Sequence, residues 1–354
     1  MPRGAPAARL AYRGGEAPGT AVAPDVGGTR VVERGRSRPV DATADGFRHD
    51  ALLFDSPADL VEVAVPWLRE GLEAGDAAVI AASADTADVL REALDGDQRV
   101  HVLERGDVYR ARTPTAITTF RNLRDERSTV PGSTVRVVGE LDFGPTERDW
   151  LEWQRYEAVI NEALHGWSLW GLCVFDTQRL PDALIDCALG THPQVRTRGG
   201  RGPNPHFVDP AEYLRALPVP VEPLEAAPPR LAARDVSDFI GLRHAVAGEL
   251  SGLAAPRDLV EDFLLAVDEM TSNALRHGRP PVGLRLWVGA DRIVCRIGDR
   301  GVGWDDPFAG YGPAHGDDLS RGGMGLWLAR QLCDHVDICC DADGAHVRLA
   351  VRLG

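Results

Sequence analysis

The stretch that decides the fold is VDEMTSNALRHG, residues 267–278. It carries a carboxylate at Glu269 and a carboxamide at Asn273, and side chains four residues apart stand on one face of a helix. We expect the helix to end at His277 and Gly278, because glycine is typical of a helix C-terminus. A separate apolar stripe, which we expect to be buried, consists of Leu259, Phe263, Leu264, Val267 and Met270. The two polar side chains can therefore contact one small ligand while the rest of the helix packs.

This helix belongs to a larger pattern in residues 231–354. The expected elements are helices at 235–250 and around 267–278, strands at 282–288 and 292–299, a helix at 326–332, and strands at 335–340 and 345–353. Two helices, a hairpin, a loop with a helix and a second hairpin predict an open mixed sheet with helices on one face.

A different pattern fills residues 47–210, where short apolar runs alternate with helical segments. The expected strands lie at 51–54, 77–82, 99–103, 134–141 and 169–175. Strands that are covered on both faces of a sheet have continuous apolar sequences. This half of the chain therefore predicts a parallel α/β sheet, which we expect to end near residue 195.

The segments outside these two patterns are predicted to be extensions and connectors. A disordered extension is predicted for residues 1–46, which are rich in Gly, Pro, Ala and Arg. A Pro- and Gly-rich connector is predicted for residues 196–205. We expect residues 211–230, a short amphipathic piece followed by a Pro-rich run, to be a semi-rigid linker between the two domains.

All 39 basic residues are arginine, and the sequence contains no lysine. This excludes a Walker A loop, whose lysine contacts phosphates, and enzymes that form a Schiff base on lysine. It also excludes the protein-kinase fold, which needs a strand lysine. Any chemistry on ATP must therefore use another fold.

Composition narrows the class of partner and the compartment. A net charge of -14 argues against a nucleic-acid surface, which needs cations to neutralise phosphates. No run reaches the roughly 18 apolar residues of a membrane span, and no secretory signal opens the chain, so we expect a cytoplasmic protein. The six cysteines show no CxxC pair, which argues against a zinc site or a redox motif and favours buried thiols.

Three motifs follow one another in residues 231–354. They are Glu269-x-x-x-Asn273 on a helix, Asp299-Arg-Gly301-Val-Gly303 after a strand, and Gly323-Met-Gly325-Leu before a helix. Asp299 follows Asn273 by 26 residues, and Gly323 follows Asp299 by 24. In this order and context, residues 231–354 resemble the GHKL (Bergerat-fold) ATPases, most closely the anti-sigma-factor serine kinases among them. The resemblance implies a C-terminal α/β sandwich that binds ATP and Mg²⁺.

The residue types suit that chemistry. Asn273 offers a neutral amide oxygen to Mg²⁺, which favours oxygen ligands. Glu269, one turn earlier, is the candidate catalytic base that accepts a proton from an incoming hydroxyl. Asp299 can accept a hydrogen bond from the adenine amine. The cofactor-binding residues implied by the resemblance are Asn273, Asp299, Gly301, Gly303, Arg321, Gly322, Gly323, Met324, Gly325 and Leu326.

Two features of the motif region depart from the family pattern. Relatives often have a Gly-Thr pair near adenine in the last strand, where this chain has Gly344-Ala345-His346. An arginine is common in relatives at the position of Met324. We expect residues 304–320, which lack periodicity, to form a mobile lid over ATP.

The first domain resembles the MEDS sensory domain, a RecA-like module found fused to regulators. The residues that carry this resemblance are His49-Asp-Ala-Leu-Leu-Phe54, Arg136-Val-Val-Gly139-Glu140, Tyr156-Glu157 with Asn161, Leu172-Cys173 through Asp176, and Thr191-His192-Pro193. Polar residues beside strands of a doubly wound sheet gather at one sheet edge. The candidate sensory residues, whose role is open between a small ligand, a metal and a structural function, are His49, Glu140, Cys173 and His192.

Together these features predict a regulator in which a sensory domain controls an ATP-dependent serine/threonine protein kinase that acts as an anti-sigma factor. The expected partners are a sigma factor and an antagonist protein that carries the acceptor serine, and we expect a homodimer. Two alternatives stay open: a protein that binds ATP and sequesters a sigma factor without phosphate transfer, and a histidine kinase, for which His244 is the acceptor to test.

Overall fold

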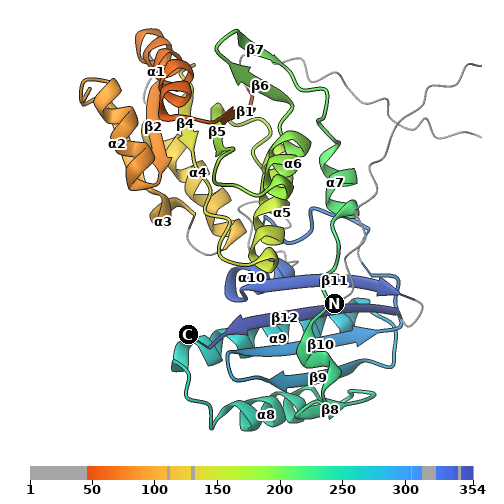
Figure 1. The fold of residues 1–354 in the computed structure, drawn as a ribbon. Coiled ribbons are helices and arrows are strands. Elements are labelled where there is room, and N and C mark those ends of the chain that lie inside the picture. Colours follow the sequence, from red (N-terminus) through yellow and green to blue (C-terminus); the bar gives the residue numbers. More distant parts are fainter. Residues whose placement is uncertain are drawn as a thin grey trace, which may run out of the picture. The chain divides into compact units, whose positions relative to one another are not determined.

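The computed structural model describes residues 46–109, 112–128, 132–303, 305–312, 324–341 and 344–353. The predicted disordered extension, residues 1–46, lies outside this range except for its last residue. The described residues form a seven-stranded sheet and a five-stranded sheet, each with its own helices (Figure 1). Within these ranges, every helix is too short or too polar to cross a bilayer.

The first sheet has the strand order β3-β2-β4-β5-β1-β6-β7. Its strands are β1 Arg48–Phe54, β2 Ala77–Ala82, β3 Val100–Glu104, β4 Val135–Gly139, β5 Leu169–Asp176, β6 Gln194–Thr197 and β7 Gly200–Pro203. Neighbours pair in parallel except β6 with β7, which are antiparallel. The predicted parallel α/β sheet is therefore confirmed.

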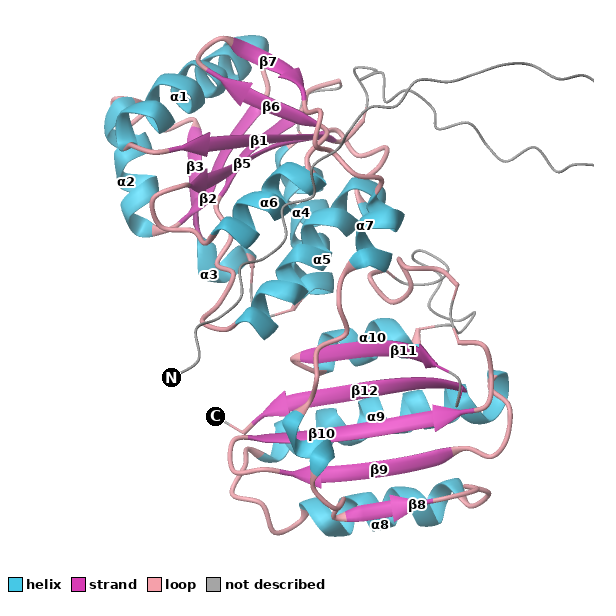
Figure 2. Ribbon diagram, turned by 45° about the vertical axis from the view of Figure 1, so that its right-hand side comes forward, coloured by secondary structure: helices cyan, strands magenta, loops and turns pink. Residues whose placement is uncertain are grey.

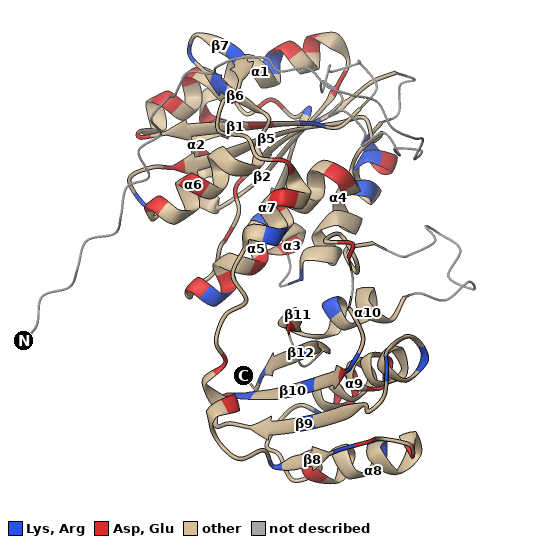
Figure 3. Ribbon diagram, turned by 90° about the vertical axis from the view of Figure 1, so that its right-hand side faces the viewer, with Lys and Arg blue, Asp and Glu red and all other residues tan. Residues whose placement is uncertain are grey.

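Helices cover both faces of this sheet. They are α1 Pro57–Ala74, α2 Ala84–Ala93, α3 Arg105–Val108, α4 Thr113–Arg127, α5 Glu147–Ala163, α6 Asp182–Thr191 and α7 Pro210–Ala216. Alternate residues of β2 face opposite sides: Ala78 and Ile80 pack in the core under α1 and α2, whereas Val79 and Ala81 pack in the core under α4, α5 and α6. Strand β2 has no charged residue, and charges gather instead on helices such as α1 and α5 (Figure 3).

The sheet extends further along the chain than predicted. Residues 196–205, expected to be a connector, contain part of β6 and all of β7. Strand β6 joins β1, with Asp50 opposite Gln194 and Ala51 opposite Val195. These strands are four residues long and rich in Arg and Gly, so they lack the apolar run by which a strand is usually recognised. Arg201 of β7 donates to the buried Asp50 carboxylate at 2.8 Å, which helps to hold the hairpin on the sheet.

The second sheet is antiparallel and has the order β11-β12-β10-β9-β8. Its strands are β8 Leu231–Ala233, β9 Gly283–Val288, β10 Arg292–Asp299, β11 His335–Asp341 and β12 Gly344–Arg352. Helices α8 Phe239–Leu250, α9 Arg257–His277 and α10 Gly325–Leu332 lie on one face, as predicted (Figure 2). Strand β8 was not predicted, and α8 begins later than expected because Asp238 caps it by accepting from the Gly241 N–H at 2.8 Å.

Part of the predicted linker is ordered against the second sheet. The 3₁₀ helix η1, Pro223–Ala226, lies in residues 217–230. Glu222, just before it, accepts from Arg292 of β10 at 2.8 Å, and the carbonyl of Ala227 accepts from the Trp287 indole of β9 at 2.9 Å. The Pro-rich stretch therefore continues the second domain at its amino end.

The apolar stripe of α9 packs on the sheet as predicted. Phe263, Val267 and Met270 are buried against core residues of β9 and β10, while Glu269 and Asn273 are only half-buried. This orientation fixes which face of α9 remains available to a ligand.

We predict that Phe263→Ala lowers the free energy of unfolding of this domain by about 3–5 kcal/mol, because it leaves a cavity in the core. Leu265→Ala, two residues along the same helix, is the matched control: Leu265 is 40% exposed, whereas Phe263 is 0% exposed. The control should change stability by less than about 1 kcal/mol. Urea unfolding of both variants measures the difference, and equal losses would contradict the described packing of α9.

Candidate functional site

The amino end of α10 lies against the polar face of α9. A methyl group built on Gly325, the first residue of α10, would lie 2.8 Å from Oε2 of Glu269 and 3.0 Å from Nδ2 of Asn273. Only a residue without a side chain leaves both groups in place. Because the first N–H groups of a helix have no partner within it, this end suits an anion. A carboxylate, a carboxamide and a helix N-terminus therefore meet at one point.

Asp299, the last residue of β10, connects the end of α9 to the sheet. Its Oδ1 accepts from the backbone N–H of Arg279 at 3.0 Å and from that of Gly301 at 2.6 Å. Oδ2 makes no hydrogen bond to any of the described residues. One oxygen thus fixes the orientation of the carboxylate, and the other is left to accept from a ligand.

Helix α9 ends at His277, as predicted, but for a different reason. Gly278 is extended, with φ -79° and ψ -172°, and does not adopt the left-handed conformation of a usual glycine cap. A Cβ on Gly278 would lie 2.4 Å from Cγ of Asp299. Glycine is needed here because the Asp299 carboxylate comes so close to the backbone.

A pocket opens between the end of α9 and the loop after β10. Within the second domain its lining residues are Asn273, Ala274, His277, Gly278, Arg279, Asp299, Gly301, Val302, Gly303, Asp306, Phe308, Ala309, Gly310, Tyr311, Gly312 and Leu326. Asn273 and Asp299, predicted to bind one ligand, therefore face the same pocket. Glu269 does not line it and lies one helical turn from Asn273, beside Gly325.

The glycines of the loop after β10 are required by packing within the protein. A Cβ on Gly301 would lie 2.5 Å from Oδ1 of Asp299. Gly303 has φ +75°, and a Cβ there would lie 2.3 Å from Sγ of Cys340 and 3.2 Å from Cβ of Ala345. Ala345 in turn pairs with Asp299 across β12 and β10, so it lies at the Asp299 end of the pocket.

Several predicted residues lie at or beyond the limit of the described chain. Arg321, Gly322 and Gly323, and most of the predicted lid, fall in residues 304 and 313–323, outside the described residues. Met324 immediately precedes α10 without capping it through its side chain. Leu326 is 5% exposed and belongs to the core while it also borders the pocket.

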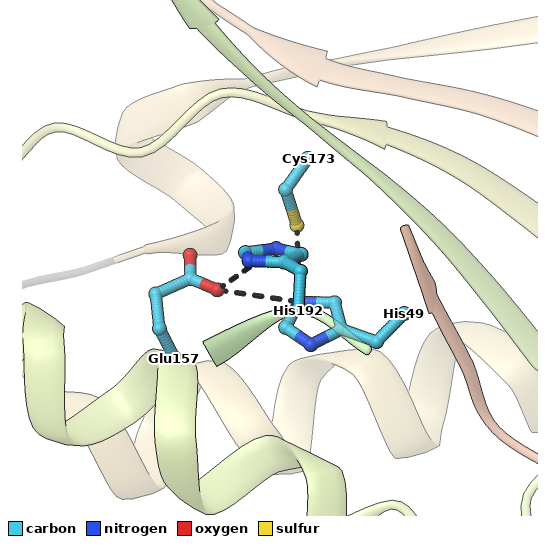
Figure 4. Close-up of side chains that lie close together, drawn as sticks. All are labelled: His49, Glu157, Cys173 and His192. Carbon is cyan, nitrogen blue, oxygen red and sulfur yellow. Dashed lines mark hydrogen bonds and ion pairs between the residues drawn. The ribbon is translucent and has the colours of Figure 1, made fainter. Parts of the chain in front are cut away.

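In the first domain, three of the four candidate sensory residues meet in the interior (Figure 4). Nε2 of His49 lies 3.4 Å from Sγ of Cys173. Nε2 of His49 and Nε2 of His192 lie 3.2 Å and 3.4 Å from Oε2 of Glu157. We call these four residues, His49, Glu157, Cys173 and His192, the His49 cluster.

The fourth candidate, Glu140, lies elsewhere. It follows β4 and accepts from the N–H and the hydroxyl of Ser83 at 2.8 Å and 2.6 Å. Glu157, and not Glu140, is the carboxylate of the cluster. Tyr156 and Glu157 carried part of the MEDS resemblance, but Glu157 was not singled out as a site residue. The available signal was a carboxylate followed by the apolar residues Ala158, Val159 and Ile160 on a helix that covers a sheet.

The cluster lies on a face of the sheet, not at the sheet edge where it was expected. His49 pairs with Gly171 and Ala51 with Cys173 between β1 and β5, so His49 and Cys173 project from the same face. Glu157 comes from α5, which covers that face, and His192 follows α6. His49, Glu157 and His192 are each at most 2% exposed, so the cluster belongs to the domain interior.

Comparison with known families matches both halves of the chain. Residues 48–193 match the MEDS family, described as the methanogen/methylotroph, DcmR sensory domain. Residues 233–351 match the histidine kinase-like ATPase domain.

Similar proteins come from several bacteria. The serine-protein kinase RsbW of Bacillus velezensis is 31% identical over 113 residues, which cover 28% of this chain and 71% of that protein. RsbW of Halalkalibacterium halodurans is 33% identical over 112 residues, 29% of this chain and 69% of that protein. The crystal structure of the RsbU and RsbW domains of Rv1364c from Mycobacterium tuberculosis matches with 18% identity and a TM-score of 0.26, over 35% of this chain and 33% of that one.

Fold, site and matches together define a histidine kinase-like ATPase domain joined to a MEDS domain. Within that class, the chain belongs to the family of the RsbW serine-protein kinases. Both resemblances predicted from the motifs are thereby confirmed. The chain is a regulator with an ATP-binding, kinase-like domain.

We predict that Gly325→Ala leaves the protein folded but weakens binding of ATP by about tenfold, or about 1.4 kcal/mol. The added methyl would displace the flexible end of Glu269 and the amide of Asn273. Calorimetry measures the affinity. Gly248→Ala in α8 is the control, because a Cβ there meets nothing within 4 Å, and it should bind as the wild type does. Unchanged affinity in Gly325→Ala would contradict this view of the site.

Proposed function

We propose that this chain is an ATP-dependent protein serine/threonine kinase that acts as an anti-sigma factor under the control of its MEDS domain. The observation that carries the proposal is the meeting of Glu269, Asn273 and the amino end of α10 at Gly325, with Asp299 in the same pocket as Asn273. The names of the RsbW relatives, which are serine-protein kinases, support it.

The phosphate end of the nucleotide belongs at α10. The chain has no lysine, so positive charge toward the phosphates must come from the helix N-terminus, from Mg²⁺ and from arginine. Asn273 fits as a magnesium ligand because its amide is neutral and lies beside this helix end. Mg²⁺ bound there would neutralise charge that develops on the transferred phosphoryl group.

Glu269 is the candidate general base. Its carboxylate lies against Gly325, at the same helix end that receives phosphate. A serine hydroxyl that attacks the γ-phosphoryl group must lose a proton, and a nearby carboxylate can accept it. The half-buried position of Glu269 on α9 holds the carboxylate in place while leaving it accessible from the site.

The adenine end belongs at Asp299. Because Oδ1 accepts two backbone N–H groups, Oδ2 remains to accept from the exocyclic amine of adenine. Guanine presents a carbonyl at that position, which a carboxylate repels. This arrangement therefore favours ATP over GTP. Ala345, which pairs with Asp299, offers no hydroxyl there, so Asp299 carries more of the recognition than it would beside a threonine.

The proposed partners are those implied by the resemblance to the anti-sigma-factor serine kinases. We propose a sigma factor that the ATPase domain binds and an antagonist protein whose serine receives the phosphate, with the chain acting as a homodimer. The main alternative is a protein that binds ATP and sequesters the sigma factor without phosphate transfer. The two are distinguished by phosphate on the antagonist.

We predict that Asp299→Asn lowers ATP affinity by about 10- to 100-fold while the domain stays folded. Asparagine can keep Oδ1 as the acceptor for Arg279 and Gly301, but it replaces Oδ2 with an NH₂ group that faces the adenine amine. Nucleotide titration of the variant tests this. Asp291→Asn, at the other end of the β9–β10 hairpin, should bind ATP normally, because that side chain is 73% exposed and pairs with Arg292. Normal ATP binding by Asp299→Asn would refute the assignment.

We predict that Glu269→Gln reduces phosphate transfer to the antagonist at least 100-fold with ATP affinity retained, because the amide cannot accept the hydroxyl proton. Acid-stable label from γ-labelled ATP on the antagonist is the measurement. Glu261→Gln on the same helix is the control, since that side chain is 60% exposed and pairs with Arg257. If the wild type binds ATP and captures the sigma factor without labelling the antagonist, the sequestering alternative holds. Acid-labile label would instead indicate phosphohistidine.

A further inference from the structure

The His49 cluster brings four groups with lone pairs together in the interior of the first domain, and the ATPase chemistry does not use them. Their metal-binding atoms all lie within 4.8 Å of one another. They come from four elements or their ends, β1, β5, α5 and α6, so the fold itself assembles them. Because these groups are buried, their hydrogen-bonding capacity must be met by one another or by a bound ion.

Hydrogen bonds outside the cluster fix the His192 ring. Its Nδ1 lies 2.8 Å from the carbonyl oxygen of Ala188. A carbonyl oxygen only accepts, so Nδ1 carries the proton and donates. The Thr191 hydroxyl, 3.1 Å from the same nitrogen, donates its own proton to the carbonyl of Cys187. In the neutral ring, Nε2 therefore presents a lone pair toward Glu157.

Asn161 fixes the His49 ring in the same way. Its Nδ2 donates to the backbone carbonyls of Glu157, Ala158 and Thr191, so its Oδ1 is the acceptor that faces Nδ1 of His49 at 3.1 Å. Nδ1 of His49 is then the donor, and its Nε2 also presents a lone pair to the cluster. Histidines that bind metals typically have this outer partner on the other ring nitrogen.

The lone pairs converge on the carboxyl group of Glu157. Both Nε2 atoms face one oxygen of Glu157, and neither carboxylate oxygen has a hydrogen-bond donor among the described residues. A fully buried carboxylate without a partner is costly. Because Nδ1 of each ring already donates outside the cluster, neither neutral ring has a proton left for Glu157. A single cation among the four groups would contact all of them.

We propose that the His49 cluster is a binding site for one divalent transition metal ion of the zinc type. A tetrahedral zinc site with bonds of about 2.0–2.3 Å has ligand atoms about 3.3–3.7 Å apart. The distances of Glu157 Oε2 from the two Nε2 atoms are 3.2 Å and 3.4 Å, and that of Cys173 Sγ from His49 Nε2 is 3.4 Å. Thiolate and imidazole ligands select zinc or a similar ion over Mg²⁺ and Ca²⁺.

The surroundings of the cluster favour a rigid site. The rings of His49 and His192 lie 3.7 Å apart, Phe47 stacks on His49, and the edge of Phe175 meets His192. Burial raises the pKa of the Cys173 thiol well above its ordinary value, so without a cation it stays protonated and unreactive. Metal binding would release that proton to solvent as the thiolate forms. Four protein ligands leave no open position, which is typical of a structural zinc site.

The test uses the untagged full-length protein, freed of metal and titrated with Co²⁺. We expect one Co²⁺ per chain, visible absorption typical of four-coordinate cobalt, and a thiolate-to-cobalt charge-transfer band in the near ultraviolet. Zn²⁺ should displace it. Cys173→Ser should lose the charge-transfer band, and Glu157→Gln should weaken binding by more than about 100-fold. Circular dichroism establishes that each variant is folded.

Matched controls use residues of the same types outside the cluster. Cys340→Ser and His165→Ala should both bind cobalt as the wild type does, because these residues are exposed. Absence of stoichiometric cobalt binding by the wild type would overturn the proposal, as would a charge-transfer band that persists in folded Cys173→Ser. Should Cys173→Ser fail to fold, X-ray absorption of the wild-type zinc form decides: one sulfur with nitrogen and oxygen ligands supports the site, and a shell without sulfur refutes it.

Discussion

The geometry of the proposed nucleotide site depends on one carboxylate, that of Asp299, which accepts hydrogen bonds from the backbone of its own domain. Asp299 accepts from the N–H groups of Arg279 and Gly301, and thereby joins the end of α9 to the end of β10. This bond requires glycine at 278 and 301, because a side chain at either position would collide with the carboxylate. With α9 held in this way, Asn273 faces the pocket and Glu269 reaches the start of α10.

The two domains place their polar groups in different environments because their sheets are covered differently. The second sheet carries helices on one face, and its pocket opens where α9, the loop after β10 and α10 come together. The first sheet is covered on both faces, so polar side chains that point from its strands are enclosed by helices. Polar groups there must satisfy one another or a bound ion. The His49 cluster follows from that constraint.

The sequence predicted elements and motif order well where the signal is local. Asp299 could be placed at a strand end because RIVCRIGD is an unbroken strand pattern, and Asn273 because the apolar stripe of α9 fixes its face. Strands β6 and β7 were missed since they are short and polar and are held by pairing with a distant strand. The His49 cluster was predicted only in part. Its residues are far apart in the chain, so a search for closely spaced CxxC pairs could not find a Cys173 site. Glu157 was missed because a carboxylate followed by apolar residues on a helix marks a buried site only once that helix is known to cover the sheet.

The contact between Gly303 and Cys340 has a practical consequence. Cys340 is an exposed, free thiol on β11, and its sulfur lies beside the glycine of the loop that borders the pocket near Asp299. A fluorophore attached to this sulfur would stand next to the Asp299 end of the pocket, and its emission would report whether a ligand occupies that end. With adenine at Asp299, as proposed, the same thiol would capture an electrophilic purine analogue covalently, and Cys340→Ala or Cys340→Ser would abolish the capture.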